Sequence, residues 1–305
     1  MDISSEFSEL MWLALSKEKQ SSAISGNEPE MALLPGLCCQ AAGGDASWAD
    51  IVTAAWMLFY AAADIMDNIE DKDVPVSWWG DSGPATALSV ATGLYFSATS
   101  VLYQMERKDV TKKIAPVVIQ DFFNCFMIMS SGQYDDLRIP QPTIEQYWKI
   151  ASAKSGAFFA LACRSGARLV LGDGPHCKLY GQFGNQIGLL LQILDDLDEI
   201  SFKNQLVTPA TVEKLTRSLP VVYTMQMVPD ETKERLKVCL QNAFHESSAA
   251  KEALAIMEES GAMLYLLSEI ERNKKLALDS LTRAEATSPA GEILTSYVEK
   301  LGALS

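Results

Sequence analysis

The sequence predicts an all-α protein, and three observations lead to this fold class. Apolar residues recur at spacings of three and four, strand-like alternation of apolar and polar residues is almost absent, and several stretches are apolar on most faces. A helix that is apolar all round is buried, so we expect several of these helices at the centre of a bundle of about ten or more helices. Because no repeat, linker or low-complexity block divides the chain, we expect residues 1–305 to form a single domain.

The first helices follow from long apolar stretches and their flanking turn residues. A helix is predicted over 47–71, with Ser47 as its N-cap after a pair of glycines. The helix is apolar on most faces until its carboxylate cluster begins at Asp64. An Ala-, Ser- and Thr-rich helix is predicted over 83–106, and a very aromatic one over 114–131.

The later helices are separated by proline breaks and caps. Thr143 and Gln146 form a predicted capping box that opens a helix carrying Lys154. An apolar helix over 179–200 ends in acidic residues, a loop is predicted over 202–209, and a helix resumes over 213–227. From 231 to 301 the pattern is amphipathic helix with a break near Ser288-Pro289.

Composition and charge exclude several classes of protein. The chain has 305 residues, of which 48% are hydrophobic and 21% charged, so a large core is possible and wholesale disorder is excluded. The net charge of −14 argues against a nucleic-acid partner. The chain opens without a basic segment, and its longest apolar run, 51–63, is too short to span a bilayer. We therefore expect a cytoplasmic protein without stable membrane insertion.

The cysteines and histidines suggest no soft-metal site. None of the six cysteines forms a C-x-x-C pair, so we expect reduced thiols in the core rather than a zinc site or disulfides. The chain has only two histidines, which excludes a histidine-rich metal site.

Two acidic clusters stand out because each closes an apolar helix. In the first, the spacing i, i+3, i+4, i+7 places four side chains on one helix face: Asp64, Asp67, Asn68 and Asp71. In the second, which also contains Asp196, the residues Asp195 and Glu199 are again i, i+4. Like charges at this spacing repel, and cations compensate them.

These carboxylates match the ligand preference of Mg²⁺. Hard cations take oxygen ligands and commonly bridge one or two carboxylates to a substrate phosphate. Two carboxylate faces across a cavity would hold several Mg²⁺ ions around a diphosphate and stabilise the charge that develops as a C–O bond breaks. Either cluster alone is equally consistent with a solvated helix end, but the presence of both favours the metal site.

Four motifs resemble the trans-isoprenyl diphosphate synthases, in the right order over about residues 30 to 285. Residues 183–196 are similar to the family's F-G-x-x-L-G-x-x-x-Q-I-x-D-D segment, and 132–137 to its G-Q-x-x-D-L. Residues 154–157 resemble K-T-G/A, and 217–220 resemble a basic residue followed by T/S-L-P.

The resemblance implies the all-α isoprenoid-synthase fold around a central cavity, ionisation of an allylic diphosphate with about three Mg²⁺ ions, and a homodimer. It implies metal ligands at Asp64, Asp67, Asp71, Asp195, Asp196 and Glu199. Of these, Asp64, Asp67 and Asp195 are the expected catalytic residues. The implied substrate-binding residues are Gln133, Asp136, Lys154, Gln192 and Arg217.

Departures from the family pattern bear on the second substrate. Chain-elongating members carry G-K-R-x-R-P near the N-terminus and R-R-G after the first acidic motif, where they bind isopentenyl diphosphate. Here no Lys or Arg occurs from Gln20 to Asp71, and the R-R-G position is Lys72-Asp73-Val74. Binding a second diphosphate without paired cations is costly, so we expect no ordinary chain elongation.

The first acidic motif leaves its register open. Aligned on Asp64 and Asp67, the family's first Asp is replaced by Ala63; shifted by one turn, the motif has Asn68 in second place. The stretch 64–73 also resembles the ComQ group, which has a similar fold and prenylates a tryptophan of a peptide without isopentenyl diphosphate.

Three functions remain open at this point. The preferred one is ComQ-like transfer of a prenyl group to an indole or peptide tryptophan. The second is intramolecular capture of the cation, as in a class I terpene synthase. The third is a non-catalytic regulatory subunit of a prenyl diphosphate synthase, which has no need for two acidic faces. Bulky Phe59 and Tyr60, one turn before the first acidic motif, predict a short pocket for a C10–C20 substrate.

Overall fold

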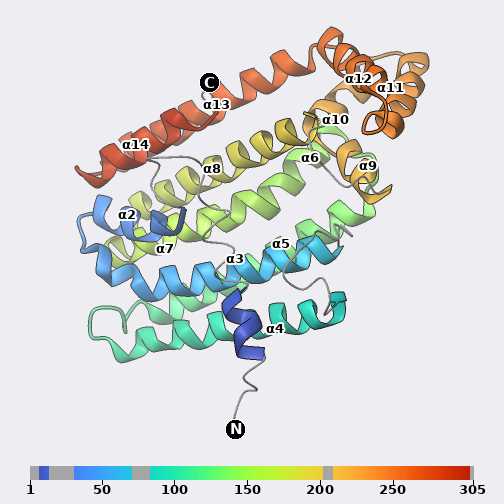
Figure 1. Cartoon of the computed structure of the whole chain (residues 1–305). Coiled ribbons are helices and arrows are strands. Elements are labelled where there is room, and N and C mark those ends of the chain that lie inside the picture. The colour runs from blue at the N-terminus through green and yellow to red at the C-terminus, as the bar shows by residue number, and fades with distance from the viewer. Residues whose placement is uncertain (1–6, 14–30, 71–82, 202–208, 303–305) are drawn as a thin grey trace.

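The computed structural model describes residues 7–13, 31–70, 83–201 and 209–302. Within these ranges the chain is helical and contains no β-strand, which confirms the predicted all-α class. Thirteen α-helices lie between residues 34 and 300 (Figure 1). They are α2 (Leu34–Ala41), α3 (Asp50–Glu70), α4 (Gly83–Leu102), α5 (Ala115–Arg138), α6 (Ile144–Ala151), α7 (Ala157–Leu171), α8 (Pro175–Glu199), α9 (Pro209–Thr216), α10 (Leu219–Met227), α11 (Asp230–Asn242), α12 (Ser247–Glu259), α13 (Ala262–Arg283) and α14 (Ala290–Lys300). Short 3₁₀ turns occupy Met31–Leu33, Ala46–Ala49 and Tyr103–Arg107, and a π-helical turn, η4 (Ser152–Gly156), joins α6 to α7.

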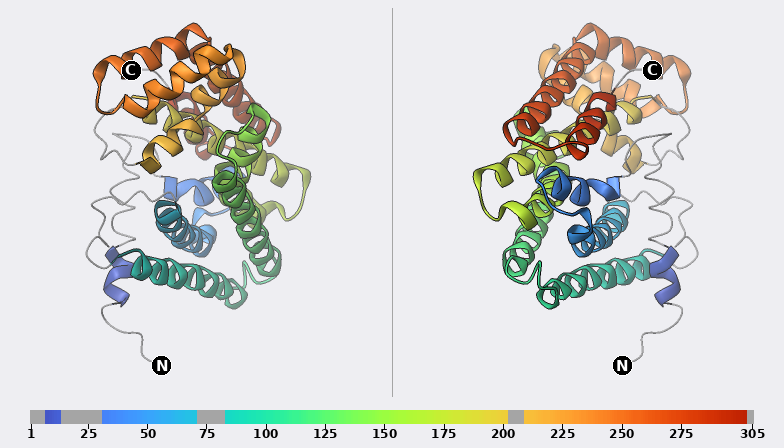
Figure 2. Two further views of the ribbon diagram at one scale, coloured as in Figure 1. Left: turned by 90° about the vertical axis from the view of Figure 1, so that its right-hand side faces the viewer. Right: turned by 90° about the vertical axis from the view of Figure 1, so that its left-hand side faces the viewer.

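The long apolar helices form the centre of the bundle, as their sequences predict. Helix α8 packs mainly against α7 and α13, and α3 packs mainly against α4 (Figures 1 and 2). The largest fully buried side chains include Trp56 and Phe59 on α3, Phe122 on α5, and Tyr180 and Phe183 on α8. The acidic carboxyl-terminal ends of α3 and α8 are thus anchored by their own buried apolar turns.

Two motif glycines explain how α8 approaches the helix before it. Gly184 lies against the carbonyl of Phe159 on α7, and Gly188 lies against the carbonyl of Ser155 in η4. A Cβ atom at either position would collide with that backbone oxygen. The glycines therefore permit a close backbone contact that sets the distance between the Lys154 segment and the second acidic motif.

Most element boundaries agree with the sequence predictions. The stretch 231–301, predicted with one break near Ser288-Pro289, is also interrupted between α11 and α12 and between α12 and α13, and three further corrections follow. The capping box between Thr143 and Gln146 is confirmed, with both of its hydrogen bonds present. The N-cap before α3 is Asp45 rather than Ser47, because the Asp45 carboxylate accepts the Ser47 N–H at 2.9 Å. Helix α5 continues to Arg138, about two turns beyond its predicted end at residue 131.

The third correction concerns the helix predicted over 213–227. It is two helices, because Pro220 restricts the backbone before it and α9 ends at Thr216. The loop predicted over 202–209 lies, apart from Pro209, outside the described residues.

All six cysteines are free and buried, which confirms the prediction of core thiols: Cys38, Cys39, Cys125, Cys163, Cys177 and Cys239. Among the described residues, Ala46–Glu70 and Gly83–Arg107 are long and apolar enough to cross a membrane by length and composition alone. The first of these helices contains the apolar run 51–63, and it is longer than that run alone indicated. Half of its most apolar window is buried in the molecule, and a core helix passes the same test, so these two helices are weak evidence for a membrane span.

Candidate active site

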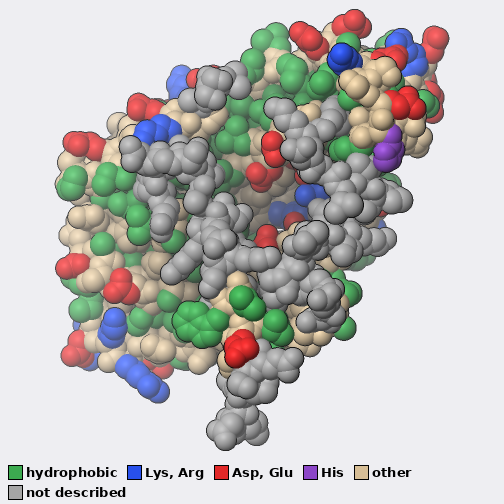
Figure 3. All heavy atoms as spheres, in the orientation of Figure 1, with side chains coloured by type: hydrophobic (Ala, Val, Ile, Leu, Met, Phe, Trp, Pro, Cys, Tyr) green, Lys and Arg blue, Asp and Glu red, His purple; other side chains and the backbone are tan. Residues whose placement is uncertain are grey.

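The predicted basic residue Lys154 lies between two acidic helices. Its Nζ is 2.8 Å from Asp136 Oδ2 on α5 and 3.3 Å from Asp67 Oδ1 on α3. The ammonium is supplied by η4, whose π-helical turn the sequence analysis did not predict. Acidic and basic side chains gather at the floor of a hollow on the face shown in Figure 3. The structure thus brings three predicted site residues together from separate elements.

The second acidic motif faces this cluster. Asp195 is exposed, yet the protein around it and the neighbouring Glu199 raise its pKa to about 6. Asp67 adds to this upward pKa shift through its charge, whereas Lys214 counteracts it. The ends of α3 and α8 therefore lie close enough for their carboxylates to repel one another, as the opposed-face hypothesis requires.

Asp196 has a different environment from its neighbour. Only 3% of it is exposed, and both of its oxygens accept hydrogen bonds. Oδ2 accepts from the Tyr147 hydroxyl at 2.6 Å and from the Leu219 N–H at 2.7 Å, and Oδ1 accepts from Gln192 Nε2 at 3.1 Å. Burial raises the pKa of Asp196 to about 7, although these donors act in the opposite direction. The sequence analysis did not predict the role of Tyr147. Its hydroxyl meets a carboxylate 49 positions away in the chain, and the local sequence of α6 gives no signal for such a contact.

Gln192 connects this buried carboxylate to the segment that carries Lys154, and Arg217 binds the backbone of Asp136. Gln192 Oε1 accepts a hydrogen bond from Ser155 Oγ at 2.9 Å, directly beside Lys154. Arg217 donates from Nη1 to the backbone oxygen of Asp136 at 2.9 Å, and its side chain is 9% exposed. Both predicted substrate-binding residues therefore border the Lys154 cluster.

Gln133 and Glu70 also lie near the Lys154 cluster, because the charges of Lys154 and Asp67 both act on Glu70. Neither amide atom of Gln133 makes a hydrogen bond with the part of the chain that the structure describes. The amide is nevertheless close enough to Glu70 to counteract the effect of burial, which raises the pKa of that carboxyl.

The remaining predicted ligands are placed as follows. Asp64 is half-buried, and its Oδ2 accepts from Asn68 Nδ2 at 3.2 Å. Glu199 forms an ion pair with Lys214 at 3.0 Å. Asp71 lies outside the described residues. Within the described ranges, no three carboxylate, histidine or cysteine side chains are already grouped so as to hold one metal ion.

The donor set of the site nevertheless fits Mg²⁺. The exposed ligand candidates are carboxylates, which are the oxygen donors this ion prefers, and Mg²⁺ keeps several waters rather than requiring a cage of protein ligands. The charge of Asp67 raises the pKa of Asp195, and a cation bound beside Asp195 would oppose this effect. Asp67 and Asp195 are the side chains best placed to hold the ion, whereas Asp196 has its oxygens occupied.

An aromatic cluster lies beneath the charged residues. Phe59 contacts three rings, with centroid distances of 3.8 Å to Phe126 and 5.5 Å to both Tyr95 and Phe158. Burial raises the pKa of Tyr95 to about 12, and the charges of Glu70 and Asp67 act in the same direction. The aromatic cluster therefore lies within electrostatic reach of the charged residues, an arrangement that suits a ligand with an anionic head and a hydrocarbon tail.

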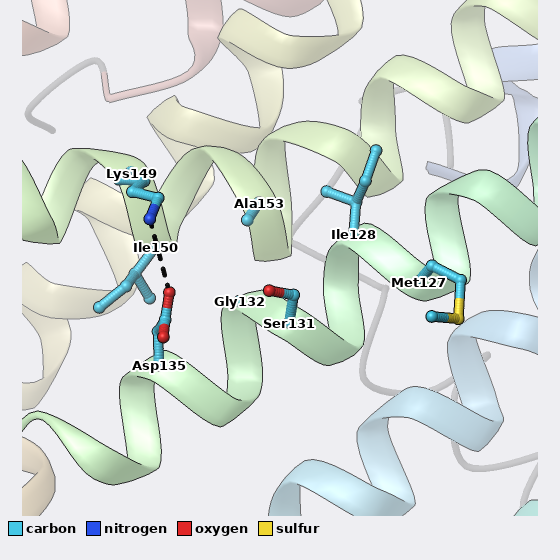
Figure 4. A pocket seen from close by; sticks show the side chains of 8 residues that line it. All are labelled: Met127, Ile128, Ser131, Gly132, Asp135, Lys149, Ile150 and Ala153. Atoms are coloured by element: carbon cyan, nitrogen blue, oxygen red, sulfur yellow. Dashed lines mark ion pairs between the residues drawn. The ribbon is translucent and has the colours of Figure 1, made fainter.

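A second cavity, of about 330 Å³, lies between α5 and α6 with η4 and contains none of the predicted site residues. Its apolar lining includes Met127, Ile128 and Ile150, and the Asp135–Lys149 ion pair of 3.7 Å crosses it (Figure 4).

Known proteins share both the fold and the sequence pattern. Over 98% of its length the chain superposes on geranylgeranyl pyrophosphate synthetase from Pyrococcus horikoshii, covering 95% of that chain with a TM-score of 0.79 and 19% identity. A polyprenyl synthetase from Streptomyces coelicolor gives a TM-score of 0.75 at 20% identity, covering 96% of this chain and 95% of that one. These similarities confirm the predicted isoprenoid-synthase fold.

Relatives in sequence are of the same kind. The short chain isoprenyl diphosphate synthase of Methanothermobacter thermautotrophicus is 28% identical over 251 residues, which cover 78% of this chain and 73% of the relative. Geranylgeranyl pyrophosphate synthase 1 of Zymoseptoria tritici is 24% identical over 273 residues, which cover 83% and 75%. The family model for polyprenyl synthetase matches residues 32–257, so the chain belongs to the polyprenyl synthetase family.

Proposed function

We propose that this protein is a Mg²⁺-dependent enzyme that ionises an allylic prenyl diphosphate and transfers the cation to an acceptor other than isopentenyl diphosphate. Family membership supports prenyl diphosphate transfer, and polyprenyl synthetases are generally Mg²⁺-dependent. The observation that carries the proposal is the position of Lys154, which pairs with Asp67 and Asp136 opposite Asp195.

The chemistry of each group follows from its place. Asp67 and Asp195, with Asp64 beside them, would hold Mg²⁺, which stabilises the leaving diphosphate when bound. Lys154 and Arg217 supply positive charge to the diphosphate oxygens. The allylic C–O bond breaks with both electrons going to the diphosphate, and the carbocation is left above the aromatic rings, whose faces stabilise positive charge.

The acceptor follows from what the sequence lacks. No Lys or Arg occurs from Gln20 to Asp71, and of the segments that correspond to the family's isopentenyl-binding motifs only 31–35 lies within the described residues. This deficit of positive charge favours an uncharged nucleophile, such as an indole or a peptide tryptophan, over a second diphosphate. The aromatic floor at Phe59 supports a C10–C20 chain.

A homodimer is part of the proposal. Neighbouring turns of α5 expose large apolar side chains, among them Met127 at 72%, Ile128 at 49% and Tyr134 at 60% exposure, and Phe96 on α4 is 71% exposed. An exposed apolar surface of this kind is typical of an interface between subunits.

The test is to incubate the protein with Mg²⁺ and farnesyl or geranylgeranyl diphosphate, with and without indole and a tryptophan-containing peptide, and to analyse products by mass spectrometry. We expect pyrophosphate release that depends on the nucleophile and a prenylated indole product. Release without an acceptor, with a hydrocarbon or alcohol product, would instead support a terpene synthase. No release in either condition, with stimulation of a co-expressed synthase, would support a regulatory subunit.

A further inference from the structure

A basic turn joins α4 to α5, in a chain whose net charge is −14. Residues 106–113 contain four basic and two acidic side chains, so this turn alone carries a net charge of +2. Its basic side chains are all exposed: Arg107, Lys108, Lys112 and Lys113. Lys112 forms an ion pair with Asp109 at 2.7 Å, and the other three form no ion pair with the part of the chain that the structure describes. Positive charge is therefore concentrated on one turn of an acidic molecule.

The basic turn is fixed from the inside by two buried residues. Met105 is fully buried and Thr111 is 1% exposed, and the Thr111 hydroxyl donates to the Met105 carbonyl at 2.7 Å. The N–H groups of Thr111 and Lys112 both donate to the Lys108 carbonyl, at 3.1 and 2.9 Å. Because these contacts order the backbone, the exposed side chains are displayed on a preformed surface, and binding through them requires little further backbone ordering.

Apolar side chains lie among these charges. Val110, in the middle of the basic turn, is 52% exposed, and Tyr103, at the start of the preceding 3₁₀ turn, is 49% exposed. The headgroup region of an anionic bilayer suits this combination. Its phosphates attract basic side chains, and the boundary with the acyl chains takes up apolar and tyrosine side chains.

The basic turn lies at the end of the bundle opposite the hollow. Asp136, which contacts Lys154, is near the C-terminal end of α5, whereas the turn precedes the N-terminal end of the same helix. The 24 residues of α5 span about 36 Å at about 1.5 Å per residue. Figure 1 shows the connection between α4 and α5 at the other end of the bundle from the acidic ends of α3 and α8. A surface in contact with the turn therefore leaves the hollow open.

We propose that the basic turn is a docking surface for membranes that contain anionic lipids. Lipid phosphates contact Arg107, Lys108 and Lys113, and Val110 lies at the boundary with the acyl chains. The attraction acts over about one Debye length, which is about 8 Å at physiological salt, so more distant acidic side chains are largely screened from the membrane. Because the surface lies apart from the hollow, membrane binding can be tested separately from prenyl transfer.

The test is co-flotation of the protein with vesicles of phosphatidylcholine alone or mixed with phosphatidylglycerol, over a range of lipid concentrations. We expect binding only to the vesicles that contain phosphatidylglycerol, and weaker binding at higher salt. Lys108→Gln combined with Lys113→Gln should weaken it about 25-fold, which is about fivefold for each charge removed. The matched control is Lys251→Gln combined with Lys275→Gln, which removes two exposed lysines on α12 and α13 and should change binding by less than about twofold.

Val110→Ser separates a bilayer from a soluble acidic partner. It removes an apolar contact and keeps every charge, so it should weaken vesicle binding about threefold. The substituted side chains are all exposed, so the variants should keep the natural fold. Binding of the natural protein to neither kind of vesicle, equal binding to both, or equal effects of the two lysine pairs would overturn the proposal. Vesicle binding that is unchanged in Val110→Ser would overturn it in favour of a soluble acidic partner.

Discussion

At the scale of single residues, the site shows that neighbouring aspartates in one acidic motif have different surroundings. Asp195 is exposed to the hollow, and Asp196 is buried under three hydrogen-bond donors. The motif alone assigns both to metal binding, because spacing on a helix does not reveal which side chain meets a donor from another element. The sequence did identify Lys154, Asp67 and Asp136, which the structure brings into contact.

The ionised carboxylate of Asp195 is expected to destabilise the folded protein in the absence of metal. Its pKa is raised from 3.8 to about 6 in the folded protein, so the folded state binds the proton more tightly than the unfolded state. The stabilisation is present below about pH 4 and is lost as the pH rises through about 6. Asp195→Asn should therefore raise the melting temperature in metal-free buffer at pH 7.5 and abolish pyrophosphate release. A fall in melting temperature, measured by circular dichroism, would contradict this role. Pyrophosphate release by the variant, measured by a phosphate assay after hydrolysis with pyrophosphatase, would contradict it too.

The Mg²⁺ requirement should depend on pH through the same group. A protonated carboxyl does not bind the ion, so the Mg²⁺ concentration for half-maximal activity should rise as the pH falls below about 6. Excess Mg²⁺ should restore activity at moderately acidic pH. A Mg²⁺ requirement that stays constant from pH 8 to pH 5.5 would exclude Asp195 as a ligand with this pKa.

At the scale of elements, the sequence predicted what depends on local pattern and missed what depends on packing. The capping box at Thr143 and the apolar periodicity of α8 are local, and the structure confirms both. The π-helical turn at 152–156 and the split between α9 and α10 were missed, because each is set by neighbouring helices that a single window of sequence does not contain.

The contact of α8 with η4 gives a prediction at this scale. Gly188→Ala places a methyl group against the Ser155 carbonyl, so η4 must shift and move Lys154. We expect a loss of about 1–3 kcal/mol in the free energy of unfolding and of at least about tenfold in pyrophosphate release. Gly181→Ala on the same helix is the control, because its methyl group would lie at an ordinary 3.5 Å from the Arg164 side chain. Equal effects of both substitutions would show that the close approach at Gly188 has no special role.

At the scale of the whole molecule, the apolar surface of α5 predicts a dimer. Met127→Glu places a charge in the middle of this surface and should convert the protein to a monomer in light-scattering measurements. Val238→Glu is the matched control, since Val238 on α11 is 57% exposed and lies away from α5. A natural protein that is already monomeric, or a dimer that persists in Met127→Glu, would contradict an interface through this surface.

The central claim has two parts. The site has charged residues that bind one diphosphate, and the chain lacks basic residues where a second diphosphate would bind. The most direct test is to supply Mg²⁺ with isopentenyl and dimethylallyl diphosphates, and separately with farnesyl diphosphate and an indole acceptor, and to identify the products by mass spectrometry. The account predicts no longer prenyl diphosphate in the first reaction and acceptor-dependent pyrophosphate release in the second. Accumulation of geranyl or farnesyl diphosphate in the first reaction would contradict it and make this protein an ordinary chain-elongating synthase.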